Sequence, residues 1–348
     1  MNIAVYVPPV SKKPTANFIV ETFFPLLRQF PDHDYILITD VSSECGPMPG
    51  FEKITIRDQP KNPILKSFWI ERTLSGLIKK IKADLFISAD DFCSLSTSLP
   101  QCILMPASGN LGGAYAKKPE LLIVTNELAK KELITKWKLR DDKIVIVYPS
   151  PGNKYSPLNA DTCESVKAKY SGGKEYFLCI GSFPKQEKFI HLLKSFSHFK
   201  KRQQSSFKLL ISGPQNSSLG KSLENYKYRN DVIIVNTGSI GEKAAITAAA
   251  YALVLAFNPD EDITYAFGAM QSAVPVITTR NSSISEIAGD AVLYSENEIT
   301  AMGEKMMQLY KDELLKSQLI EKGYRLVKDF TVEKSASRLW QSMMKAMN

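Results

Sequence analysis

The chain has 348 residues, of which 44% are apolar and 23% charged, and its net charge is +8. This length predicts about two domains, each large enough to bury its own core. No apolar run approaches the roughly 20 residues of a membrane span, and the start of the chain resembles a first strand rather than a signal peptide. The five cysteines are scattered without CxxC spacing. This spacing argues against a zinc site or a disulfide framework and fits a cytoplasmic protein.

The first half of the chain alternates strand-like and helix-like segments. The predicted strands are Ile3–Val7, Asp34–Thr39, Ile54–Ile56, Leu85–Ser88, Gln101–Met105, Leu121–Val124 and Ile144–Val147. Between them, apolar residues recur at helical spacing in Phe18–Phe30, Phe68–Ile81 and Asn126–Trp137. Such alternation is typical of a parallel sheet covered by helices on both faces.

A break at Tyr148–Gly152 opens a polar segment, after which the alternation restarts. We therefore predict an N-terminal domain of residues 1–165, joined by the C-terminal helix 332–348, and a C-terminal domain of residues 166–331. Both are expected to be doubly wound α/β domains, with a cleft between them. The later strands and helices are expected at Glu175–Ile180, Ile190–Lys201, Phe207–Ser212, Val232–Asn236, Ala244–Tyr251, Ile299–Lys311, Leu314–Val327 and Val332–Met347.

The segment from Tyr251 to Tyr294 predicts a βαβ unit. A strand, Leu253–Phe257, leads into an acidic loop, then a short helix, then a second strand at Pro275–Thr278. Ligands of doubly wound domains lie beyond the carboxyl ends of the strands, which here is the acidic loop with Asp260, Glu261 and Asp262. The alternative is a solvated loop in which Asp262 only caps the helix.

Several segments in this order resemble the GT-B glycosyltransferases of family 4. They are Val124–Pro149, Tyr176–Phe183, Phe207–Gly213, Ala252–Leu255, Ala269–Thr278, Asn281–Ala291 and Phe330–Ser335. The resemblance implies two Rossmann-like domains facing a cleft, with the acceptor on the N-terminal side and the donor on the C-terminal side. It also implies sugar transfer from a nucleotide-diphosphate sugar to an acceptor hydroxyl, in glycan or glycolipid synthesis. Neither a cofactor nor a metal is expected.

The resemblance assigns donor-side roles, with catalytic roles falling on Asp260 and Glu261. The family has two glutamates flanking the donor loop, and these positions fall on Asp260 and Gly268. Gly268 has no carboxylate, so we expect either a lost ribose contact or a close approach by a ligand or another backbone. The donor-binding residues implied are Gly181, Ser182, Lys185, Lys188, Gly213, Asp262, Ile263, Thr264, Tyr265 and Gly268.

The cations of the family pattern are displaced in this sequence. Gln186 and Glu187 occupy the positions of the usual arginine and lysine, and Lys185 and Lys188 flank them. These two lysines are expected either to meet the donor phosphates or to be solvated loop charges. On the acceptor side the candidates are Lys12, Lys13, Gly109 and Asn110, for which a solvated loop and a tight turn are the alternatives.

The basic charge bears on the expected partners. Lysines cluster at Lys79–Lys82, Lys117–Lys118, Lys130–Lys131 and Lys200–Arg202, and they are interpreted either as solvated helix faces or as an attraction for anions. We expect a nucleotide sugar, a glycan or lipid-linked acceptor, and peripheral contact with an anionic membrane at its inner face. No nucleic-acid motif accompanies the charge, so nucleic acid is not expected. The alternative function is an inactive relative that serves as a partner subunit of an active glycosyltransferase or as a glycan- or nucleotide-binding module.

Overall fold

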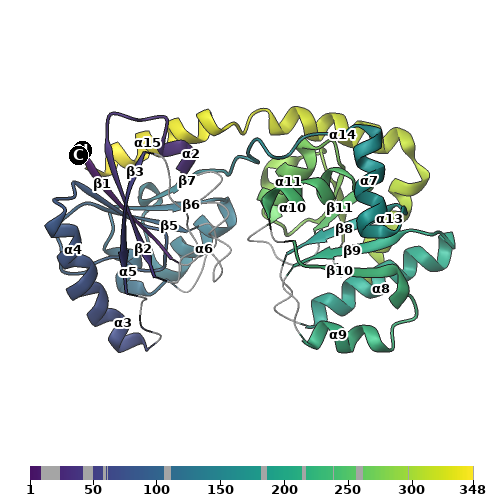
Figure 1. The fold of residues 1–348 in the computed structure, drawn as a ribbon, viewed down its shortest axis with the longest axis horizontal. Helices are drawn as coiled ribbons and strands as arrows, with labels where there is room; N and C mark the ends of the chain where they lie inside the picture. Colours follow the sequence, from purple (N-terminus) through teal and green to yellow (C-terminus); the bar gives the residue numbers. More distant parts are fainter. Residues whose placement is uncertain are drawn as a thin grey trace. The chain divides into compact units, whose positions relative to one another are not determined.

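The computed structural model describes residues 1–8, 24–41, 50–57, 60, 62–105, 111–181, 186–213, 217–237, 239–255, 262–296 and 298–347. The chain divides into two compact units, one of Met1–Ser150 with Val332–Asn348 and one of Pro151–Thr331 (Figure 1). Within the described ranges, no helix combines the length and the apolar character needed to cross a bilayer.

The first unit is built on a seven-stranded sheet in the order β3-β2-β1-β4-β5-β6-β7. Every neighbouring pair is parallel. The strands are β1 (Asn2–Val7), β2 (Asp34–Asp40), β3 (Phe51–Ile56), β4 (Leu85–Ser88), β5 (Gln101–Met105), β6 (Leu121–Val124) and β7 (Ile144–Ile146). The order reverses beside β1, and this reversal defines a doubly wound fold.

Helices cover both faces of this sheet. They are α2 (Phe24–Leu27), α3 (Pro63–Trp69), the π-helix η3 (Ile70–Leu74), α4 (Ser75–Lys80), α5 (Gly113–Lys117), α6 (Glu127–Trp137), the 3₁₀-helix η4 (Asp141–Lys143) and α15 (Val332–Met347). The C-terminal α15 lies beside α2 (yellow and purple in Figure 1). It buries Leu339 and Met343, and Trp340 stacks on Phe30 at 4.3 Å between ring centroids. The last helix is therefore part of the first unit.

The rod formed by α3, η3 and α4 begins earlier than the sequence pattern predicted. Its apolar spacing pointed to Phe68–Ile81, but the helix starts at Pro63. The Asn62 side chain accepts hydrogen bonds from the amides of Ile64 and Leu65, and Pro63 fits the first helical turn. The Asn62 cap therefore determines where the helix starts. Apolar spacing missed this start because the apolar side chains of the first turn are not buried.

The second unit has a six-stranded parallel sheet in the order β10-β9-β8-β11-β12-β13. Its strands are β8 (Tyr176–Ile180), β9 (Lys208–Ser212), β10 (Val232–Val235), β11 (Ala252–Leu255), β12 (Val276–Thr279) and β13 (Leu293–Ser295). Its helices are α7 (Ala160–Ser171), α8 (Gln186–Gln203), α9 (Ser217–Glu224), η5 (Arg229–Asp231), α10 (Ile240–Ala248), α11 (Asp262–Gln271), α12 (Ser285–Ala288), α13 (Ile299–Lys311) and α14 (Glu313–Val327).

Helix α7 lies where the sequence indicated only a polar segment, and the domain limit expected at residue 165 falls inside it. Asn159 caps the helix by accepting from the Thr162 amide, and Gly172 ends it in the left-handed conformation. The helix packs on α10 and β9. Residues 151–165 therefore belong to the second unit.

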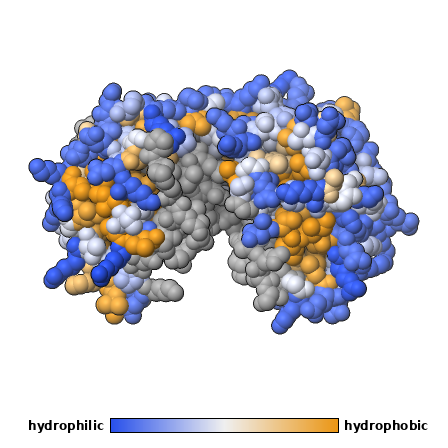
Figure 2. All heavy atoms as spheres, viewed as in Figure 1, coloured by the Kyte–Doolittle hydropathy of each residue, from blue (hydrophilic) through white to orange (hydrophobic). Residues whose placement is uncertain are grey.

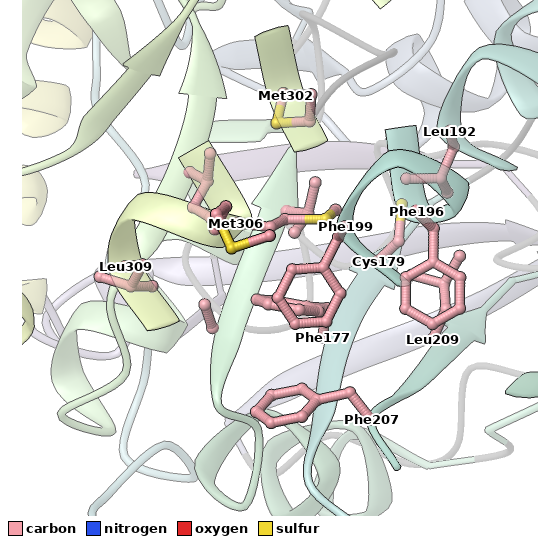
Figure 3. Packing of buried hydrophobic residues seen from close by; sticks show 14 of the residues in the cluster. Phe177, Cys179, Leu192, Phe196, Phe199, Phe207, Leu209, Met302, Met306 and Leu309 are labelled. Atoms are coloured by element: carbon pink, nitrogen blue, oxygen red, sulfur yellow. The ribbon is translucent and has the colours of Figure 1, made fainter. Parts of the chain in front are cut away.

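An aromatic core fills the space between β8 and the pair α8 and α13. Figure 3 shows Phe177 of β8 facing Phe199 of α8, with Met306 of α13 at their side. The two rings meet edge to face, with centroids 5.0 Å apart. Aromatic pairs in this geometry contribute beyond the area they bury. This cluster anchors β8, the strand that ends next to Gly181, one of the implied donor-binding residues.

Replacing Phe199 by alanine should destabilise the second unit by about 3–5 kcal/mol, because it leaves a cavity in this core. Urea unfolding followed by far-UV circular dichroism would measure the change. Leu314→Ala is the control, because Leu314 is 69% exposed and its loss should change the free energy of unfolding by less than about 0.5 kcal/mol. Equal effects of the two substitutions would contradict this account of the core.

Candidate functional site

The site of the second unit lies where its strand order reverses. After β8 the chain goes to β9 and β10 on one side, and β11 to β13 lie on the other side. The loops that leave β8 and β11 therefore diverge, and such a point at the carboxyl edge of a parallel sheet forms a ligand crevice. Helix α8 follows β8 and α11 follows β11, so two helices begin at this edge.

Two glycines, Gly181 and Gly213, lie at this edge of the sheet. Gly181 follows β8 with φ = 132°, a conformation that side chains disfavour. Its amide donates to the carbonyl of Ser212 at 3.0 Å. A Cβ atom on Gly213 would lie 2.1 Å from the carbonyl oxygen of Gly181, so only glycine fits there. The backbones that leave β8 and β9 are therefore in direct contact, which keeps side chains out of the crevice at these points.

In the first turn of α8, the side chain of Lys188 is exposed, whereas that of Gln186 is hydrogen-bonded to α9. Gln186 donates from Nε2 to Ser222 Oγ of α9 at 2.8 Å. Glu187 lies 3.8 Å from His191 on the same helix. Lys188 is exposed. The first-turn amides of a helix lack intrahelical acceptors and carry partial positive charge. Lys188 and these amides are therefore positive groups at the start of α8, beside the exposed carboxylate of Glu187.

Helix α11 supplies a second set of first-turn amides. Ile263 is buried at 1% exposure, which fixes the helix against the sheet, and Thr264 and Tyr265 are half-buried. The acidic loop before it, with Asp260 and Glu261, lies outside the described residues, as does the side chain of Asp262. Also outside them are Ser182, Lys185, Lys12, Lys13, Gly109 and Asn110.

Gly268 lies inside α11, and the ring of Tyr155 occupies the space beside it. A Cβ atom at Gly268 would lie 2.6 Å from Tyr155 Cε1. Tyr155 is only 2% exposed, and its carbonyl accepts a hydrogen bond of 2.9 Å from Gln271 Nε2. An aromatic side chain, and not the ligand or backbone considered from the sequence, therefore lies close to Gly268, and it comes from a segment that the sequence analysis did not single out.

The corresponding edge of the first unit carries buried carboxylates that sequence reasoning did not single out. Asp40 ends β2 and accepts from the Tyr6 hydroxyl at 2.9 Å, and both residues are buried. Asp90 follows β4, is 3% exposed and accepts from the Asp91 amide. An acidic residue directly after an apolar strand was the available signal. These groups lie beside β1, where the order of this sheet also reverses.

Glu71 of η3 holds the loop that follows β4. Its carboxylate accepts from the amides of Leu95 and Ser96 and from the hydroxyls of Ser94 and Ser96. Burial alone would raise the pKa of this carboxyl, but the four hydrogen bonds outweigh it and lower the pKa below 4.5. The loop at this edge is thereby fixed to the rod of α3, η3 and α4.

Comparison with known proteins finds a family similarity in the second unit. Residues 164–326 match the family model described as glycosyl transferases group 1. The matched segment is less than half of the chain. The match spans both β8 and β11, so the reversal of strand order described above lies inside the matched segment. The two parallel α/β domains also match the GT-B architecture of solved glycosyltransferases.

Three individual proteins illustrate the likeness. The chain is 21% identical over 238 residues to O-antigen chain mannosyltransferase B of Escherichia coli, covering 62% of this chain and 58% of that protein. A glycosyltransferase structure from Rickettsia africae superposes with a TM-score of 0.77 at 15% identity, covering 100% and 98% of the two chains. The Anabaena protein HepE, solved with UDP and glucose, has a TM-score of 0.76 at 10% identity, covering 99% and 100%. The structural matches concern the fold.

Gly268→Ala should destabilise the second unit by about 1–3 kcal/mol, because its methyl group would overlap the Tyr155 ring. Urea unfolding followed by far-UV circular dichroism measures this loss. Gly220→Ala is the matched control: Gly220 lies in α9, and its added Cβ would have no atom within 4 Å. Alanine there should be neutral or stabilising.

The pairing with Tyr155 can be isolated by a double-mutant cycle. Because Tyr155→Ala removes the ring, Gly268→Ala should cost much less in that background than in the wild type. Additive effects of the two substitutions would contradict the contact.

Glu71→Gln should lower the stability of the first unit at neutral pH, since an amide replaces a carboxylate that accepts four hydrogen bonds. The carboxylate's contribution is complete above the unfolded pKa, about 4.5, and is lost as the pH falls through the lower folded pKa. The difference between wild type and variant should therefore shrink below pH ~4.5. Trp69, Trp137 and Trp340 all lie in the first unit, so tryptophan fluorescence reports its unfolding alone. Glu132→Gln, on the exposed face of α6, should show no such pH dependence.

Proposed function

We propose that the protein transfers a sugar from a nucleotide-diphosphate sugar to an acceptor hydroxyl, in glycan or glycolipid synthesis. The observation that carries this proposal is the match of residues 164–326 to the group 1 family over the β8–β11 crevice. The mannosyltransferase relative supports it, although the chain spans only 58% of that protein. The structure of HepE with UDP and glucose supports a nucleotide sugar as the donor.

The chemistry follows from where charge develops. When the bond between the sugar and the diphosphate breaks, negative charge builds on the phosphate oxygens. Helix N-termini and cations stabilise such oxygens. In this proposal the first turns of α8 and α11 and the ammonium group of Lys188 act on the leaving diphosphate, while Gly181 and Gly213 let it approach the backbone. Asp260 and Glu261 act on the sugar and its hydroxyls.

A second candidate is a non-catalytic subunit that binds a nucleotide or glycan beside an active glycosyltransferase. Two observations favour it. The Tyr155 ring fills the space of a side chain at Gly268, and the side chain of Gln186 is engaged with Ser222. Both positions carry charged residues in the family that the sequence resembles, so the site lacks part of the usual binding set. Turnover separates the two candidates.

The purified chain should bind UDP or GDP in isothermal titration calorimetry, and should release nucleoside diphosphate from at least one sugar in a panel of nucleotide sugars. Lys188→Gln should weaken binding of that diphosphate about tenfold, because it removes a charged partner of the phosphates. Binding of the bare nucleoside should not change.

Lys194→Gln is the matched control, because Lys194 is also exposed on α8 but lies beyond its first turn. Its Kd for the diphosphate should equal that of the wild type. Binding without turnover would favour the non-catalytic subunit. Absence of both binding and turnover would refute the transferase and also a non-catalytic subunit that binds a nucleotide.

A further inference from the structure

Helix α3 of the first unit presents large apolar side chains to solvent. Ile64, Leu65 and Phe68 are 80%, 58% and 59% exposed. Figure 2 shows hydrophobic colour at this tip of the unit, at the lower left. Contiguous exposed apolar residues on a folded domain mark an interaction surface. We call these three residues the α3 patch.

The rest of the rod fixes the orientation of the patch. Trp69, Ile70, Leu74 and Ile78 are buried against the sheet, so the rod cannot rotate to hide its opposite side. The exposed side continues at helical spacing from Leu65 and Phe68 through Arg72 and Gly76 to Lys79. This stripe is therefore apolar at the start of the rod and basic at its end.

The charge of the rod is strongly unbalanced. The segment from Asn62 to Lys82 contains one acidic residue, Glu71. Its cationic residues are Lys66, Arg72, Lys79, Lys80 and Lys82. That carboxylate accepts four hydrogen bonds from the 94–96 loop. The guanidinium of Arg72 lies 5.1 Å from the centre of the Phe68 ring, which joins the basic and apolar parts of the stripe. The complementary surface is thus both apolar and anionic.

We propose that the α3 patch and its basic stripe bind the surface of an anionic lipid bilayer. The apolar side chains enter the boundary between headgroups and acyl chains, and Arg72, Lys79 and Lys80 face the lipid phosphates. A helical surface with one apolar part and one cationic part suits a bilayer surface, where apolar insertion and electrostatic attraction act together. A purely apolar partner would leave the cations of the stripe without a counterpart.

The location of the patch links it to the transfer reaction. Helix α3 begins after β3 leaves the sheet at its carboxyl end, and Lys66 pairs with Asp91, in the loop after β4, at 3.0 Å. The patch therefore lies at the edge where the chain also leaves β1 and β5. Binding would hold this edge, on which the acceptor is expected, toward the bilayer. This last step alone rests on the proposed function and suits a lipid-linked acceptor.

Co-flotation with vesicles tests the proposal. The full chain should bind vesicles of phosphatidylcholine mixed with phosphatidylglycerol, bind phosphatidylcholine alone far less, and lose binding as salt rises. The triple substitution Ile64→Ser, Leu65→Ser and Phe68→Ser should weaken binding at least about tenfold. Lys79→Gln with Lys80→Gln should reduce the preference for the anionic vesicles. Leu314→Ser, at an exposed leucine of the second unit, should change nothing.

Other outcomes would overturn the proposal. Absence of binding to the anionic vesicles by the wild type would do so, as would equal binding by the triple variant. If the wild type is a dimer that the triple variant converts to a monomer, and neither binds vesicles, the patch instead joins two copies of the chain. Nucleotide binding by the triple variant, measured in parallel, should match the wild type. A failure of vesicle binding is thereby distinguishable from a failure of the proposed transferase function.

Discussion

The reversal of strand order beside β8 is the constraint on which the candidate donor site depends. Because all strands of this sheet are parallel, every connecting helix begins at one edge, but only the loops after β8 and β11 turn in opposite directions. The aromatic core around Phe177 and Phe199 fixes β8 from one face. The contact between the backbones of Gly181 and Gly213 then requires glycine at both positions, since a side chain at Gly213 would overlap the Gly181 carbonyl and one at Gly181 would strain the backbone.

Within that frame, the two ends of α11 have different roles. Its first turn lies at the carboxyl edge of the sheet, where helix amides lack intrahelical acceptors, whereas Gly268 lies against Tyr155 in the interior. A carboxylate at residue 268 would collide with the ring, so the glycine and the tyrosine depend on each other. In the proposed function, the phosphate end of the donor would thus be held by helix N-termini, and recognition of the sugar and ribose would rely more on the acidic loop before α11.

The sequence predicted the strands well because buried parallel strands are short apolar runs. Leu85–Ser88, Gln101–Met105 and Leu121–Val124 were located to the residue. Capping determined what the pattern missed: Asn62 starts α3 and Asn159 starts α7, in segments that bury few apolar residues. The contact between Gly268 and Tyr155 depends on how distant segments pack, and no local pattern encodes it. Sequence could therefore locate the candidate donor loops but could not show which side chain lies beside Gly268.

The lysines that make the net charge +8 fall into two groups in the structure, those in ion pairs and those exposed to solvent. In the second unit, Lys200 is 6% exposed and lies 2.9 Å from Asp231, which Lys208 also contacts, so this part of one basic cluster is a structural ion-pair network. Lys79 and Lys80 are instead exposed, on the same rod as the α3 patch. Structural pairs have their charge largely balanced locally, while exposed cations contribute to the long-range field. The attraction for anionic surfaces should therefore be strongest where the apolar side chains are also exposed, and this coincidence is what supports the proposed membrane contact of the first unit.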